Sequence, residues 1–281
     1  MPTFDTPEPI TATIDVVSGD VRISAGDRNA TSVTVDPADA SNDEDRRAAD
    51  QTRVEYANGQ LLVRAPKLRS WHPRSSGGAI NLTIELPVGS HVHGDGSLAD
   101  FTCDGPLCEC RIKTGLGHIR LDQAETSSLK TGIGDISVDR ATGHADITAG
   151  SGEVRVRELD SSAVIKNSNG DTWVGQAGGE LRVSAANGSI AVEAAQAGVV
   201  AKSSNGDVRL GEAVRSSVVL ETKLGDLEVG IPDGTAAWLD VRARAGRVHN
   251  ALDVAEAPEP SAETVEVRAR TSAGDVVIRR A

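Results

Sequence analysis

Residues 203–210 read "SSNGDVRL", and variants of this octapeptide stand 18 and 36 residues earlier in the chain. The copy at residues 185–192 reads "AANGSIAV", and the copy at residues 167–174 reads "NSNGDTWV". All three contain an Asn-Gly step followed by a run in which apolar side chains alternate with others. A feature that recurs at so regular an interval within one chain predicts a repeat architecture.

The same unit extends well beyond these three copies. With the glycine of each copy numbered zero, successive zeros are 17 to 19 residues apart, and they are Gly117, Gly134, Gly152, Gly170, Gly188, Gly206 and Gly225. Ala99 replaces the glycine one period earlier, and an early copy has its zero at Gly19. Looser copies follow at Gly246 and Gly274.

Each period contains two short strands. The second and fourth residues after zero, and the fifth and seventh before it, are small or apolar in almost every copy. This period-two alternation predicts strands with one buried face. Stacking the turns about 4.8 Å apart would pair the backbone of each turn with the next. Since only 2% of residues are aromatic, a narrow aliphatic interior is expected. We therefore predict an all-β fold, a parallel β-solenoid with two sheets and about 18 residues per turn.

The regular period is lost toward both ends of the chain. Residues 1–90 are predicted to form an N-terminal cap of strands, with a short helix near residues 38–52 and a hairpin near residues 53–65. Such a cap would cover strand edges that otherwise invite aggregation. Residues 91–281 are predicted to be the solenoid repeats, with closing strands at residues 265–281. Residues 68–79, 231–240 and 250–263 are predicted to be loops, the first of them mobile.

Charge and cysteine content narrow the classes of function. The net charge of -12 disfavours phosphate backbones and anionic lipid, so we expect neither nucleic acid nor membrane as a partner. The opening "MPTFDTPEPI" lacks an export pattern, and no apolar run approaches the roughly 18 residues of a membrane helix. Cys103, Cys108 and Cys110 form an odd, clustered set, which favours reduced thiols. A cytoplasmic protein is expected.

Asn169, Asn187 and Asn205 occupy the corner just before zero in three consecutive turns. Asn and Gly tolerate the left-handed backbone that a sharp corner requires, and stacked amides can hydrogen-bond along the stack. We favour such a structural ladder over the alternative of a row of amides that binds a ligand.

A row of acidic residues follows directly after zero, and it comprises Asp135, Glu153, Asp171, Asp207 and Asp226. Stacked carboxylates could hold Ca²⁺ or act as acid and base in glycan cleavage. The calcium-binding nonapeptide pattern is missing, however. The favoured interpretation is that these groups accept backbone N–H bonds at the turns and pair with Arg155 and Arg209.

The thiols together with His91 and His93 suggest zinc, but the C-x4-C-x-C spacing is unlike the usual ligand patterns. Cys103 and Cys110 also fall in interior columns, where a thiol packs as a small hydrophobe. No metal site, cofactor or catalytic residue is therefore assigned. His118, His144 and His249 have no nucleophile arrangement that the sequence supports, and the G-x-G steps lack the helix that a phosphate cradle requires.

Two sets of outward residues form the possible interaction surface. Trp173 lies in an outward column with Arg155 and Arg209, where it is either an interface anchor or a ring that covers its own sheet. On the opposite sheet Val164, Val200 and Val219 are outward and apolar, and they could form a docking strip.

The strand "INLTIELPVGS" at residues 80–90, followed by units such as "TGIGDISV" at 131–138, "GSGEVRV" at 150–156 and "SNGDVRL" at 204–210, resembles the bacterial putative-adhesin family of β-strand-repeat proteins, a family of unknown function. The resemblance spans about Ile10 to Ala281. It implies a right-handed parallel β-helix and supplies no catalytic motif.

The sequence favours a non-enzymatic cytoplasmic scaffold or protein-interaction module that presents flat solenoid faces to an unidentified protein partner or to another copy of itself. The alternatives are a polysaccharide-active β-helix enzyme that uses the stacked carboxylate row, and a surface adhesin.

Overall fold

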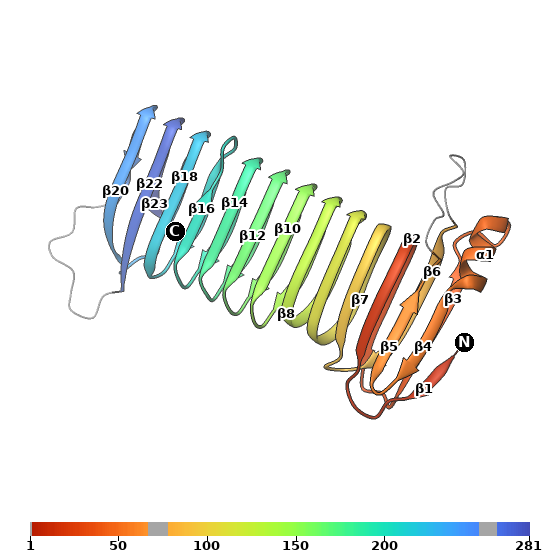
Figure 1. The fold of residues 1–281 in the computed structure, drawn as a ribbon. Helices are drawn as coiled ribbons and strands as arrows, with labels where there is room; N and C mark the ends of the chain where they lie inside the picture. The colour runs from red at the N-terminus through yellow and green to blue at the C-terminus, as the bar shows by residue number, and fades with distance from the viewer. Residues whose placement is uncertain (1, 67–77, 253–262) are drawn as a thin grey trace. The chain divides into compact units, whose positions relative to one another are not determined.

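The computed structural model describes residues 2–66, 78–252 and 263–281. The chain divides into two compact units, Met1–Asp139 and Arg140–Ala281, and each is described by itself. The described residues are mostly in strands, which Figure 1 shows as arrows. The strand β9 (Ile136–Ala141) contains the division between the units.

The first unit begins with an early coil and its cap. Its elements are β1 (Thr3–Asp5), β2 (Thr11–Gly26), β3 (Ala30–Pro37), α1 (Asp43–Gln51), β4 (Arg53–Ala57), β5 (Gln60–Arg64), β6 (Ile80–Pro87), β7 (His91–Leu116) and β8 (Ile119–Ile133). β2 pairs in parallel with β7, which places Gly19 opposite Ala99, and β7 continues in parallel to β8. The early copy of the repeat is therefore a coil stacked directly on the later ones.

Antiparallel strands cover the start of both ladders in this unit. On one side β4 and β5 form the predicted hairpin, and β5 pairs with β2. On the other side β1, β3 and β6 are antiparallel neighbours, and β6 pairs with β2. The domain boundary expected at residue 90 stays a prediction.

The predicted helix exists but begins later than residue 38. It starts at Asp43 because Asn42 is its N-cap, with Asn42 Oδ1 accepting the Glu44 N–H at 2.9 Å. Asp45 on this helix is buried and accepts N–H bonds from Asp39 and Ala79. The predicted loop at residues 68–79 falls almost wholly outside the described residues, as does most of the one at 250–263.

The second unit contains the most regular coils, arranged as two parallel ladders. One ladder comprises β10 (Ala145–Ser151), β12 (Ala163–Asn169), β14 (Leu181–Asn187), β16 (Val199–Lys202) and β18 (Ser216–Leu224). The other comprises β11 (Val154–Leu159), β13 (Thr172–Ala177), β15 (Ile190–Ala195), β17 (Val208–Ala213) and β19 (Leu227–Ile231). Val156, Val174 and Val192 are buried neighbours in register. The predicted β-solenoid is confirmed.

The last two coils are not stacked in chain order. They are formed by β20 (Ala236–Ala245) with β21 (Val248–Asn250), and by β22 (Thr264–Ala273) with β23 (Val276–Arg280). β22 pairs with β18 on one side and with β20 on the other (Figure 1). The C-terminal coil is therefore stacked between the β18 coil and the coil that precedes it in the sequence. The expectation that residues 265–281 close the stack was therefore wrong.

The burial of the two coils agrees with this order. Val265, Val267 and Ala269 on β22 are all buried, which suits a strand covered on both sides. The register partners of Val265 and Val267 on β20 are Ala237 and Leu239, and these are only half-buried. The inward side chains of the inner coil are therefore fully buried, whereas those of the edge coil are covered on one side only.

Candidate interaction surfaces

The corner row is structural, as the sequence predicts. Asn187 Nδ2 donates to Asn169 Oδ1 at 2.9 Å, and Asn205 Nδ2 donates to Asn187 Oδ1 at 2.8 Å. These asparagines do not have positive φ, however, which was part of the expectation. The zero glycines do, with φ from +125° to +152° in the seven regular copies. A Cβ added at Gly188 would also overlap the carbonyl of Gly170 in the neighbouring coil, which is a second reason for glycine at this position.

A second polar row lies inside the coils, three residues before zero, and sequence reasoning missed it. Its side chains donate to the carbonyl of the zero residue of the coil stacked beneath, and the row comprises Thr114, Thr131, Asn167, Ser203, Thr222 and Thr271. All six residues are buried. The recurrence of Thr, Asn or Ser at this position was the signal that could have revealed it.

The acidic row is largely occupied by backbone contacts. Asp171 accepts the Ser189 N–H at 2.8 Å, Asp207 accepts the Asp226 N–H at 2.8 Å, and Asp226 accepts the Asp275 N–H at 2.7 Å. These bonds satisfy amides of the next coil. Glu153 pairs with Arg155 at 2.7 Å as predicted, whereas Arg209 pairs with Glu228 at 3.5 Å rather than with Asp207.

Trp173 is held against its own sheet. Arg155 Cζ lies 5.6 Å from the ring centroid, and Trp173 Nε1 donates to Glu193 at 3.2 Å. The ring is half-buried, and Ala191 separates it from Arg209 in the column. This arrangement fits a covering role better than that of a free anchor.

The valine strip on the other ladder borders a groove of about 560 Å³ in the second unit. Val164, Arg182 and Val200 are neighbours in register on β12, β14 and β16, and all three line the groove. Val219 follows Val200 on β18, beyond the lining. No carboxylate within the described residues pairs with Arg182. The structure thus separates the predicted surface into two parts on different ladders.

Two of the three thiols of the zinc hypothesis are buried in the core, whereas the histidines are at partly exposed positions of β7. Cys103 and Cys110 are fully buried in the core. The contact with the Cys103 thiol raises the pKa of Cys110, and burial raises it further. Cys108 is half-buried, and burial, with the Glu125 carboxylate 3.5 Å away, raises its pKa also. Across residues 2–66, 78–252 and 263–281, no three His, Cys, Asp or Glu side chains form a group that could hold a metal ion.

His91 and His93 point outward toward Glu109. His91 Nδ1 and His93 Nε2 each lie 3.5 Å from Glu109 Oε2, while Glu109 Oε1 accepts Arg111 Nε at 2.6 Å. Burial raises the pKa of the Glu109 carboxyl, but its contacts with His93 and Arg111 outweigh this and hold the pKa below its ordinary value of 4.5. The carboxylate therefore orders three side chains at the edge of a second groove.

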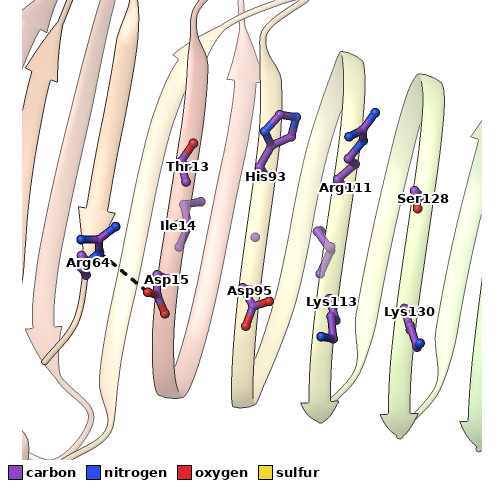
Figure 2. A pocket seen from close by; sticks show the side chains of 12 residues that line it. Thr13, Ile14, Asp15, Arg64, His93, Asp95, Arg111, Lys113, Ser128 and Lys130 are labelled. Atoms are coloured by element: carbon purple, nitrogen blue, oxygen red, sulfur yellow. Dashed lines mark ion pairs between the residues drawn. The ribbon is translucent and has the colours of Figure 1, made fainter. Parts of the chain in front are cut away.

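That second groove, of about 610 Å³, crosses β5, β2, β7 and β8 in the first unit (Figure 2). Its outward side chains form two rows across the strands. One row contains Thr13, His93, Arg111 and Ser128, and the other contains Arg64, Asp15, Asp95, Lys113 and Lys130. Arg64 pairs with Asp15 at 3.7 Å. The sequence pattern did not predict this groove.

The sequence matches a known family model, described as Toastrack DUF4097, over residues 11–279. The chain belongs to the Toastrack DUF4097 family. No curated protein matches it. None of the helices in the described part of the chain is long and apolar enough to cross a bilayer.

Several solved structures resemble this Toastrack chain at low identity. A "putative lipid binding protein" from Parabacteroides distasonis is 13% identical with a TM-score of 0.44, and the match covers 100% of this chain and 95% of the other. A "putative adhesin" from Parabacteroides merdae is 10% identical with a TM-score of 0.41, covering 99% and 94%. The family match over residues 11–279 confirms the family resemblance that the sequence indicates.

Proposed function

We propose that this Toastrack protein is a non-enzymatic interaction module of the cytoplasm that binds a protein partner through the outward face of β12, β14 and β16. The observation that carries the proposal is the groove in which Val164 and Val200 flank an unpaired Arg182. Outward positions of a solvated sheet are ordinarily polar, so apolar side chains around a cation favour a contact surface.

The chemistry of the groove defines the partner. Arg182 can form a bidentate contact with a carboxylate, and the two valines can pack against aliphatic groups on either side of it. A partner segment with an acidic residue between apolar ones would complement this face.

Two further observations support the rest of the proposal. The carboxylates that could serve in glycan cleavage instead accept backbone N–H groups of the next coil, at Asp171 and Asp207 for example. The cysteines are free thiols, two of them buried, which suits a reducing compartment. Fractionation of the native cells tests the location.

Affinity capture from the native cell extract, compared between variants, tests the surface. We expect Val200→Asp and Arg182→Glu to lose the same partner, because the first places a charge in the apolar strip and the second repels the carboxylate. Arg155→Glu, on the other ladder, is the matched control and should keep the partner. Circular dichroism confirms folding of each variant.

Retention of every partner by both groove variants would contradict the proposal, as would equal loss in the Arg155→Glu control. If the captured protein is another copy of this chain, sedimentation should show an oligomer that Val200→Asp dissociates.

A further inference from the structure

The groove of the first unit has a cationic end built from two adjacent strands. Lys113 on β7 and Lys130 on β8 are register partners, as are Arg111 and Ser128. They alternate with the buried residues Ile112 and Leu129, so their side chains share one face. The two lysine positions are therefore about 4.8 Å apart.

Neither lysine has an acidic partner within the residues that the structure describes. Like charges opposite each other on neighbouring strands are destabilising. In the same column of the second unit, Lys202 pairs with Glu221 at 2.8 Å. Lys166 in that column has no ion pair within the described part of the chain, but it lies between Thr148 and Ser184 and not opposite a second cation. Two adjacent lysines without an ion pair to any described residue therefore concentrate positive charge on this face.

The surroundings leave the ammonium groups accessible. In Figure 2 the Lys113 and Lys130 side chains extend in the same direction along their strands, away from the Arg111 head group. The next outward positions are Gly115 and Gly132, which are exposed and carry no side chain. An oxyanion can therefore approach both ammonium groups at once.

Next to the lysines the charge of the groove changes from positive to negative. Asp95 lies beside Lys113 in the same row (Figure 2) and is exposed, yet no ion pair joins the two. A carboxylate is a good acceptor for hydroxyl groups. The lining contains no Phe, Tyr or Trp ring on which an apolar ligand or a neutral sugar would stack.

We infer that this groove binds a hydroxylated oxyanion of the sugar phosphate class, with the phosphate between Lys113 and Lys130 and the hydroxyl groups at Asp95. This site lies in a different unit from the proposed protein-binding face and does not depend on it. The negative charge of the whole protein acts weakly there, since physiological salt screens charges beyond about 8 Å.

Titration of the purified full-length protein with glucose 6-phosphate, inorganic phosphate and glucose, followed by calorimetry, tests the inference. We expect glucose 6-phosphate to bind more tightly than inorganic phosphate, and glucose alone not to bind. Lys113→Gln with Lys130→Gln should weaken glucose 6-phosphate at least about tenfold, the loss expected from one charged hydrogen bond.

Two further variants separate the contributions. Asp95→Asn should reduce the preference for glucose 6-phosphate over inorganic phosphate, because its hydroxyl acceptor is weakened. Lys166→Gln, which removes an exposed lysine of the second unit, should leave binding unchanged. Unaltered binding in the double lysine variant, absence of binding, or equal affinity for inorganic phosphate would overturn the inference. A thermal unfolding curve verifies that each variant is folded.

Discussion

Single buried polar residues make the coils specific for one another. Asn167 is 2% exposed, and its Nδ2 donates to the carbonyls of Gly152 at 3.0 Å and Gly170 at 2.9 Å. The first bond joins one coil to its neighbour, and the second closes the corner of its own coil. Asn187 in the exposed corner row also hydrogen-bonds along the stack, but its side chain is in contact with water.

This difference in burial predicts a difference in stability. Asn167→Ala should lower the free energy of unfolding by about 1–3 kcal/mol, because buried carbonyls lose their donor. Asn187→Ala should cost only about 0.5–1.5 kcal/mol, because water replaces the amide. Urea unfolding followed by circular dichroism measures both.

Asn167→Thr is the matched control for this pair. Thr114 and Thr131 already make the equivalent bond in other coils, so threonine should restore most of the loss. Equal costs for the two alanine variants, or no rescue by threonine, would count against the role of the inner row.

The strands show how much of the fold the sequence could predict. The 18-residue period predicted the ladders of the second unit and their register, because every interior column repeats. It did not predict that β22 lies between β18 and β20, since both final coils have similar strand patterns and their loops are irregular. The pairing of β22 with both β18 and β20 distinguishes them, as does the full burial of Val265 and Val267 against the partial burial of Ala237 and Leu239.

The same limit applies to the two grooves. The valine strip was visible because Val164, Val200 and Val219 break the polar outward pattern. The groove at Lys113 and Lys130 was not, because charged residues at outward positions are ordinary. The repeat places both lysines four residues before zero, in neighbouring coils, but only the structure shows that they have no ion pair within the residues it describes.

The position of β22 makes a prediction at the level of the element. Val267→Asp places a carboxylate in the core between β18 and β20, which should release both β22 and β20. Hydrogen exchange followed by mass spectrometry should then show faster exchange in residues 236–245 as well as 264–273.

Glu266→Gln, on the outward side of the same strand, should leave exchange in these segments close to that of the unaltered protein. If Val267→Asp accelerates exchange in β22 and leaves β20 protected, the two strands are not neighbours.

At the scale of the whole chain, stability is distributed instead of residing in one centre. The buried side chains are mainly Val, Ile, Leu and Ala, and each coil contributes a few of them to columns that run through its unit. Repeat proteins of this kind gain stability from contacts between neighbouring repeats. The outward faces are then free to vary, which explains why the two grooves differ in charge within one repeat pattern.

The central claim is that residues one period apart are stacked in register. Arg155 is separated from Glu228 by four register steps on one ladder of the second unit, and Asp146 is separated from Val219 by four on the other. Each pair should therefore be about 19 Å apart between Cα atoms.

Electron paramagnetic resonance on spin labels at each pair, in a Cys108→Ser background, measures this most directly. In-register stacking predicts a narrow distance distribution near 19 Å for both pairs, broadened by the label linkers. A broad distribution, or a distance far longer than this in either pair, would contradict the stacked coils.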